Sequence, residues 1–237
     1  MHGVAINPAI LSATLSRLFP TGAVAAELRD AGDAKLLLPA EAGCLGRAVP
    51  KRVREFAAGR LCARRALAEF GIIDFPIEAA CDRQPVWPDS MVGSITHTTG
   101  FCAAVVAERR FTAGLGIDSE LIGDVNVEIW SRICVPLEIE WVHSLPASQQ
   151  AAAVTLIFSA KEAVYKCQYP VLHERLSFQD VSVEAVKWGA QSGLFRIHAS
   201  RSIAMCMHTA MPMQGRYQFH QEFVTAGVGL AAADSNQ

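Results

Sequence analysis

Helical and strand-like hydrophobic patterns alternate along this chain, in its first half and again in its second. A helical pattern with proline in its first turn runs from Pro50 to about Phe70, and the valine-rich segment FCAAVVAE at 101–108 has the composition of a compact strand. A second helical pattern, SQQAAAVTLIFSAKEAVYKCQY, is predicted to end at Pro170, and the segments after it alternate like antiparallel strands. Mixed helices and strands in both halves predict an α+β (α/β) fold.

The composition excludes several classes of function. The chain has 237 residues, of which 51% are hydrophobic, so it can bury a substantial core without disulfides or a structural metal. Its net charge of -2 argues against a general nucleic-acid binder, because such proteins carry strongly basic surfaces. No apolar run approaches the roughly 20 residues of a membrane span, and the N-terminus lacks a basic leader pattern. The 7 cysteines are scattered, with no Cys-x-x-Cys pair, so we expect reduced thiols in a cytoplasmic protein.

The predicted first helix is strongly basic, with a run of basic residues between Arg47 and Arg65 and one acid, Glu55. At about 100° per residue, its apolar stripe includes two arginines four positions apart, Arg60 and Arg64. A buried guanidinium needs an anionic partner, because an unpaired buried charge costs several kcal/mol. That partner would be either an internal carboxylate or the phosphate of a ligand, and the sequence favours neither.

Hydroxyl side chains and one histidine, His97, crowd the segment GSITHTTG at 93–100, directly before the valine-rich strand. These hydroxyls, Ser94 among them, could donate to an anion, and the flanking glycines would let the backbone approach a ligand closely. The same segment is also typical of an ordinary turn, and a lone histidine is more often a packed side chain than a catalyst. No Gly-x-Ser-x-Gly elbow supports a serine hydrolase.

Three acids are spaced so that their side chains can share one cation. Asp118 and Glu120 lie at i and i+2 of a predicted strand, and Glu162 and Lys166 lie at i and i+4 of a predicted helix, so each pair shares a face. Carboxylates together with waters are the usual ligands of Mg²⁺, often beside substrate phosphates. The alternative is a surface Glu–Lys pair worth about 0.3 to 0.5 kcal/mol and an unrelated acidic turn. Against that alternative, Lys161 falls in the apolar stripe of the same helix.

The order of these motifs resembles the Sfp/enterobactin-type 4'-phosphopantetheinyl transferases. GIDSE at 116–120 and FSAKEAVYK at 158–166 match the family's two acidic motifs, and EFAAGRLCARRAL, RQPVWPDSMVGSITHT and AAVVA extend the likeness over roughly residues 50–170. The resemblance implies two similar halves in a pseudo-twofold arrangement, the 4'-phosphopantetheinyl transferase fold, with coenzyme A and Mg²⁺ between them. We expect residues 1–113 to form the N-terminal half with the coenzyme-binding basic helix. Residues 114–237 would then form the C-terminal half with the metal and catalytic motifs.

The resemblance also implies a reaction, the transfer of 4'-phosphopantetheine from coenzyme A to a serine hydroxyl of an apo acyl, aryl or peptidyl carrier protein. Adenosine 3',5'-bisphosphate would be released. The family's metal ligands are matched by Asp118, Glu120 and Glu162, for Mg²⁺ with Mn²⁺ as an alternative. Glu162 also matches the general base and Lys166 would steady the pyrophosphate, whereas Lys161 belongs to the motif with a supporting and not a chemical role. Phosphate contacts of coenzyme A are matched by Arg52, Arg60, Ser94 and His97, to which the helical face adds Arg64 and the segment before QPVWP adds Arg83.

Two other functions fit the same residues. One is a Mg²⁺-dependent hydrolase that splits a nucleotide pyrophosphate with water, and the other is a non-catalytic module that binds coenzyme A or a carrier protein. A carrier-protein requirement separates the transferase from the hydrolase. We expect a monomer, because a pseudo-dimeric fold needs no second chain to complete its site. The sequence leaves open whether the carrier serves siderophore, polyketide, peptide or fatty-acid synthesis.

Overall fold

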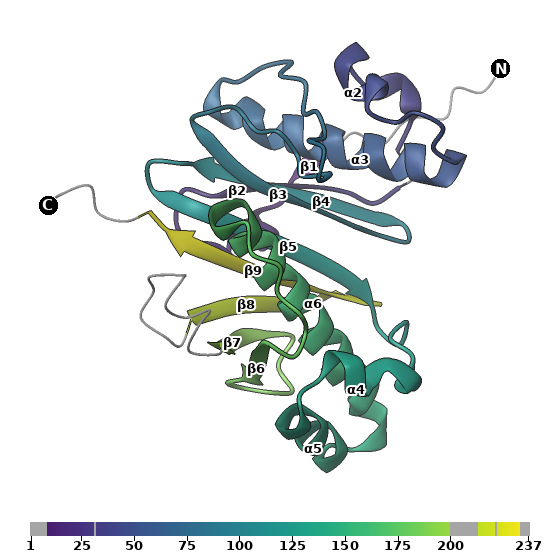
Figure 1. Ribbon diagram of the computed structural model, residues 1–237, viewed down its shortest axis with the longest axis vertical. Coiled ribbons are helices and arrows are strands. Elements are labelled where there is room, and N and C mark those ends of the chain that lie inside the picture. The colour runs from purple at the N-terminus through teal and green to yellow at the C-terminus, as the bar shows by residue number, and fades with distance from the viewer. Residues whose placement is uncertain (1–8, 31, 200–212, 221, 233–237) are drawn as a thin grey trace, which may run out of the picture.

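Two antiparallel sheets, each with a long helix packed against it, form the framework of the protein (Figure 1). The structure is a computed structural model, and it describes residues 9–30, 32–199, 213–220 and 222–232. Every strand pair within the two sheets is antiparallel. The predicted mixed class is therefore confirmed, in its α+β form.

The first sheet has the strand order β1-β2-β4-β3 and carries helix α3 (Pro50–Leu67). Proline stands in the first turn of α3, where its missing N–H costs nothing, and a short 3₁₀ turn, η2 (Ala68–Phe70), follows the helix. The buried face of α3 consists mostly of small residues, alanines with one glycine and one cysteine, so the helix lies close to the sheet. The strands of this sheet are β1 (Ile10–Leu11), β2 (Val24–Leu28), β3 (Met91–Thr98) and β4 (Phe101–Glu108). The shorter helices of this part are α1 (Ala13–Ser16), η1 (Ala34–Leu36) and α2 (Pro39–Gly43).

The second sheet has the order β5-β9-β8-β7-β6 and packs against the longest helix, α6 (Ala147–Leu172). Glycines let α6 lie directly on β5, because a Cβ at Gly116 would overlap the carbonyl oxygen of Ala163. The strands are β5 (Thr112–Leu121), β6 (Val181–Ala185), β7 (Ser192–Ala199), β8 (Met213–His220) and β9 (Phe223–Ala231). Between β5 and α6 lie η3 (Val127–Ile129), α4 (Trp130–Ile133) and α5 (Pro136–Ser144).

Helix α6 does not end at Pro170, as its sequence predicts, but continues to Leu172. A proline removes one backbone hydrogen bond, and in the last turn of a helix few bonds remain to be lost. The helix ends where His173 adopts a left-handed conformation with φ 55 and donates its N–H to the carbonyl of Tyr169. Tyr169 and Pro170, in the last turn of the helix, line the cavity described below.

Strands β3 and β5 meet although they belong to different sheets, and side chains join them in place of a backbone ladder. The Ser94 hydroxyl accepts a hydrogen bond from the N–H of Ile117 at 3.2 Å, and the Thr96 hydroxyl accepts one from the N–H of Ser119 at 2.9 Å. Both bonds satisfy backbone donors at the edge of the second sheet. We call this contact between β3 and β5 the seam.

The sequence also predicts no membrane-spanning segment and reduced cysteines. None of the helices in the described ranges is both long and apolar enough to cross a bilayer. Six cysteines are free thiols, four of them buried, and Cys206 lies outside the described residues.

Candidate active site

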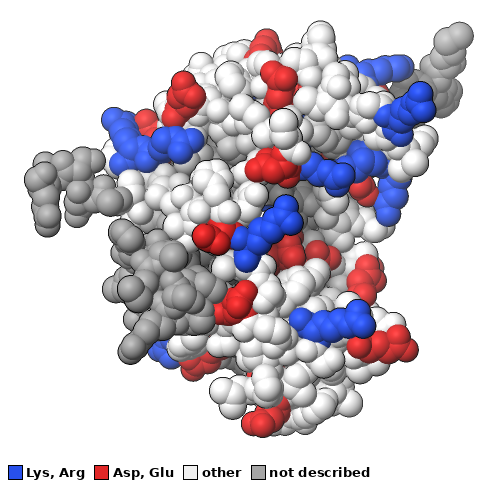
Figure 2. All heavy atoms as spheres, viewed as in Figure 1, with Lys and Arg blue, Asp and Glu red and all other residues white. Residues whose placement is uncertain are grey.

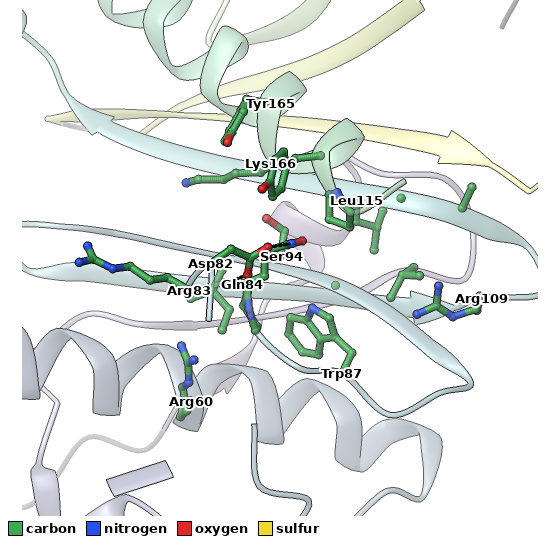
Figure 3. Close-up of a pocket in the computed structure, with 18 of the residues that line it drawn as sticks. Arg60, Asp82, Arg83, Gln84, Trp87, Ser94, Arg109, Leu115, Tyr165 and Lys166 are labelled. Atoms are coloured by element: carbon green, nitrogen blue, oxygen red, sulfur yellow. Dashed lines mark hydrogen bonds between the residues drawn. The ribbon is translucent and has the colours of Figure 1, made fainter. Parts of the chain in front are cut away.

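A cavity of about 400 Å³ lies along the seam, between α3 on one side and α6 on the other. Figure 3 shows Arg60 reaching toward it from α3, Ser94 and Leu115 forming its wall, and Tyr165 and Lys166 reaching down from α6. Arg83 and Arg109 lie toward opposite ends of the cavity. Of the residues expected to contact coenzyme A, the cavity lining includes Arg52, Arg60, Arg83, Ser94, His97 and Lys166.

Arg52 fixes the protonation of His97. Its guanidinium lies 2.8 Å from His97 Nε2, and a guanidinium has only donors, so Nε2 must be the acceptor of a neutral ring. Desolvation lowers the pKa of His97. The positive charges of Arg52 and Lys166 lower it further, whereas the negative charge of Glu55 raises it. His97 is exposed, but the bond from Arg52 by itself requires the neutral form of the ring. The proton therefore sits on Nδ1, as a donor.

Arg60 is a buried cation beside the cavity. Its Nε donates to the carbonyl of Ile77 at 2.9 Å, and its guanidinium stacks 3.8 Å from the ring centre of Phe56. Burial lowers the pKa of Arg60 to about 10, partly offset by Glu41, so the side chain stays charged at neutral pH. Within the described ranges no carboxylate lies in ion-pair contact with it. Arg60 thus keeps donors for an anion in the cavity.

Arg64 has an internal partner. Its guanidinium pairs with the fully buried Glu41, whose carboxylate also accepts hydrogen bonds from the N–H groups of Leu38 and Ile77. Arg64 does not line the cavity. Of the two partners that the sequence left open, Arg64 has the internal carboxylate, and we remove it from the expected coenzyme contacts.

Asp118 is the most buried of the three acids, with 3% of its surface exposed. Its Oδ1 accepts a hydrogen bond from Lys166 Nζ at 2.6 Å, while its Oδ2 is buried without a partner in the described structure. An unpaired buried carboxylate oxygen is costly unless a cation or donor reaches it. The ammonium of Lys166 also lies 3.3 Å from the carbonyl oxygen of Ile117, and the side chain remains 29% exposed.

Glu120 and Glu162 are acids whose charge the protein disfavours. Burial raises the pKa of Glu120 to about 8, and the neighbouring Asp118 adds to the effect. Burial and Asp118 raise the pKa of Glu162 as well, against the opposing charge of Lys166. Burial would lower the pKa of Lys166, but Asp118, Glu162 and Glu120 outweigh it and raise that pKa. One cation among three carboxylates leaves negative charge uncompensated.

The residues fit a divalent metal ion by their chemistry. Three carboxylates, one of which has an unpartnered buried oxygen, supply hard oxygen donors of the kind that Mg²⁺ prefers. Their side chains do not already form a cage, because no group of three or more His, Cys, Asp or Glu residues in the described ranges is gathered closely enough to hold a metal. Lys166 occupies one oxygen of Asp118 instead.

Lys161 points away from the cavity into the protein. Its ammonium donates to Glu138 Oε2 and to the carbonyls of Ile133 and Phe178, each at 2.8 Å. Lys161 therefore anchors α6 to its neighbours, and Glu138 is the partner that the sequence could not supply.

Sequence reasoning missed several cavity residues. Tyr165 lies three positions after Glu162, so helical periodicity could have placed both on one face. Trp87 and Arg109 carry no such signal, since they come from a loop and from the turn after β4. Figure 2 shows basic and acidic side chains interspersed over one face of the protein, with both kinds meeting in a hollow near its centre.

Comparison with known proteins decides the family. The 4'-phosphopantetheinyl transferase N-terminal domain matches residues 40–107, and the 4'-phosphopantetheinyl transferase superfamily model matches residues 114–219. The chain is 39% identical to the 4'-phosphopantetheinyl transferase Svp of Streptomyces mobaraensis, over 71% of this chain and 70% of that protein. The chain belongs to the 4'-phosphopantetheinyl transferase family.

Two further relatives agree with this assignment. Npt of Nocardia iowensis, a 4'-phosphopantetheinyl transferase, is 32% identical over 78% of this chain and 83% of its own. Enterobactin synthase component D of Escherichia coli K12 is 32% identical over 67% of this chain and 78% of its own. The resemblance read from the motifs is confirmed, and the chain is an enzyme that transfers 4'-phosphopantetheine from coenzyme A to carrier proteins.

Proposed function

We propose that this transferase binds the phosphates of coenzyme A in the cavity along the seam and carries out the transfer at the carboxylates beside it. The observation that carries the proposal is that a basic wall, formed by Arg52 with His97 and by Arg60, faces Lys166 and the buried Asp118 to which Lys166 is bonded. Three anionic phosphates need such donors, and the acids supply a place for a metal ion and a base.

Each residue proposed to contact a phosphate has a donor group that its hydrogen bonds within the protein do not use. His97 offers its Nδ1–H, since Nε2 accepts from Arg52. Arg60 offers the guanidinium hydrogens that the carbonyls of Ile77 and Glu78 do not use. Ser94 offers its hydroxyl hydrogen, because its oxygen accepts from Ile117. Arg83 adds a cation at one end of the cavity.

Asp118, Glu120 and Glu162 are proposed to hold Mg²⁺, or Mn²⁺ in its place. A bound metal would neutralise pyrophosphate charge as the bond to phosphorus breaks. Glu162 acts as the general base that takes the proton of the attacking carrier serine, and its raised pKa brings it toward the range in which a base works at neutral pH. Lys166 stays protonated and holds the pyrophosphate oxygens.

A second cavity of about 390 Å³ is lined by Glu162 and by Tyr165, which also lines the first cavity. It is lined by apolar groups such as Leu176 and Phe178 and by two arginines, Arg132 and Arg175. Coenzyme A has a pantetheine arm on one side of its pyrophosphate and a nucleotide on the other. We assign the first cavity to the nucleotide and the second to the arm, so that Tyr165, which lines both cavities, lies at the junction and Glu162 faces the arm.

The remaining features of the proposal concern organisation. The functional halves divide near Gly114, so that residues 1–113 carry the coenzyme-binding helix and 114–237 carry the acids, and the two sheets support that division. The enzyme acts as a monomer in the cytoplasm, and its acceptor is an acyl, aryl or peptidyl carrier.

The test is the intact mass of an apo carrier protein incubated with the enzyme, coenzyme A and Mg²⁺, alongside a sample containing EDTA. We expect a gain of one phosphopantetheine that EDTA abolishes. A gain that persists in EDTA would refute the metal assignment. Cleavage of coenzyme A without any gain, across several carriers, would point to the pyrophosphate hydrolase instead.

A further inference from the structure

Thr96 is a buried hydroxyl that touches the proposed metal ligand, and the proposed chemistry does not use it. It lies on β3 with 2% of its surface exposed. Its Oγ1 accepts the N–H of Ser119 at 2.9 Å and lies 3.4 Å from Asp118 Oδ1. An ionised carboxylate has only acceptors, so the hydroxyl must donate to Asp118. One side chain thus contacts both the carboxylate and the next residue of the backbone.

The other contacts of Asp118 show why this bond matters. The Ser159 hydroxyl donates to the Asp118 carbonyl oxygen at 2.9 Å and fixes the backbone from the side of α6. Lys166 and Thr96 both donate to Oδ1. Two donors thus engage one carboxylate oxygen, and the other, Oδ2, is buried with no partner in the described structure. The carboxylate is held in one orientation that leaves a single oxygen for a cation.

We infer that Thr96 is a positioning residue for Asp118: its hydroxyl holds Oδ1 so that Oδ2 is presented to the divalent metal ion. The inference rests on the proposed function, in which Asp118 is a metal ligand. Threonine suits the task, because its hydroxyl accepts from one group while donating to another and its branched side chain has few rotamers. Mutation of a group that orients a metal ligand commonly lowers metal affinity by about 10- to 100-fold.

A purely structural role for Thr96 would predict something different. The bond to Ser119 is part of the seam, so its loss would lower stability whether or not Asp118 binds a metal. Metal affinity must therefore be measured separately from stability. Thr155 is a matched control, since it is a fully buried threonine whose hydroxyl donates to the carbonyl of Ala151 and accepts from the N–H of Gly123 but does not contact Asp118.

The experiment is a titration of the full chain with Mn²⁺, followed by electron paramagnetic resonance, at a fixed saturating concentration of coenzyme A and without a carrier protein. Thr96→Val, which exchanges the hydroxyl for a methyl group, should weaken Mn²⁺ binding by about tenfold or more. Thr96→Ser should keep parental affinity, and so should Thr155→Val despite its loss of stability. In turnover, Thr96→Val should raise the half-saturating Mg²⁺ concentration and leave the KM for coenzyme A unchanged.

Parental Mn²⁺ affinity in Thr96→Val would overturn the inference, provided that Asp118→Asn abolishes binding. If Asp118→Asn also binds Mn²⁺ normally, the proposed metal site itself fails. Equal losses in Thr96→Val and Thr155→Val would assign Thr96 a structural role only and likewise overturn the inference. Should Thr96→Val not fold, Thr96→Ala replaces it: it has no hydrogen-bonding group in the side chain, and parental affinity there would be equally decisive against the inference.

Discussion

Removing the ammonium of Lys161 should destabilise the whole protein more than any exposed lysine could. The side chain of Lys161 is 1% exposed and that of its partner Glu138 is 3% exposed. Lys161→Met keeps the length and apolar stem of the side chain but leaves the Glu138 carboxylate charged and buried without a cation. It also removes a donor from the carbonyls of Ile133 and Phe178.

The expected cost follows from that geometry. Removing one partner of a buried ion pair costs about 3 to 5 kcal/mol, because the remaining charge stays desolvated. For a chain of this size, each kcal/mol lowers Tm by about 2 to 4 °C, so the midpoint should fall by roughly 6 to 20 °C. Urea unfolding followed by circular dichroism would give the free energy directly.

Two variants make the measurement interpretable. Lys51→Met removes a lysine that is 73% exposed and 3.8 Å from Glu55, and it should cost less than about 1 kcal/mol. Lys161→Met combined with Glu138→Gln should recover part of the loss, since no unpaired charge remains. Recovery would be incomplete, because the Glu138 carboxylate also accepts the N–H groups of Val135 and Val183. A loss below 1 kcal/mol in Lys161→Met would refute the reasoning.

Three further outcomes test the site. Arg60→Ala should weaken coenzyme A binding, measured by calorimetry, by about tenfold or more, as expected for the loss of a charged hydrogen bond. The control Arg65→Ala removes an exposed partner of Glu69 and should leave the affinity unchanged, so equal affinities of the two variants would contradict the role of Arg60. Glu162→Gln should lower turnover by about 10² or more while coenzyme A still binds, and a loss of only a few-fold would exclude a base at this position. In the absence of metal, the folded protein disfavours the ionised form of Glu120, so Tm should fall as pH rises from about 4.5 toward about 8. Glu120→Gln should make Tm depend less on pH over this range, and an unchanged dependence would show that another group titrates.

The sequence predicts best those features whose periodicity is local. The basic helix, the strand that bears Asp118 and the helix that bears Glu162 all form where their patterns place them. Arg60 and Arg64 were expected to face inward, and both side chains lie largely buried. Here a single element fixes the outcome, because the spacing of residues on one helix determines which side chains share a face.

Partners distant in the chain could not be predicted in the same way. Whether Arg64 meets a carboxylate or a ligand depends on Glu41, which comes from another helix, α2, and reaches α3 only through tertiary packing. Glu138 is likewise invisible as the partner of Lys161. Ser94 was expected to face a phosphate, yet its oxygen first satisfies a backbone N–H across the seam. Such pairings are decided by how the sheets meet and not by spacing along one element.

Consecutive residues of β3 would link the two proposed sites, that of coenzyme A at His97 and that of the metal ion at Asp118. Thr96 faces Asp118, and His97, the next residue, faces Arg52 on the opposite side of the strand. A small displacement of β3 would therefore alter the contact of Thr96 with Asp118 and that of His97 with Arg52 at the same time. If coenzyme A at His97 strengthens metal binding at Asp118 by some factor, the metal must strengthen coenzyme A binding by the same factor. The two ligands would then load cooperatively, and a cell short of either would leave the enzyme largely empty of both.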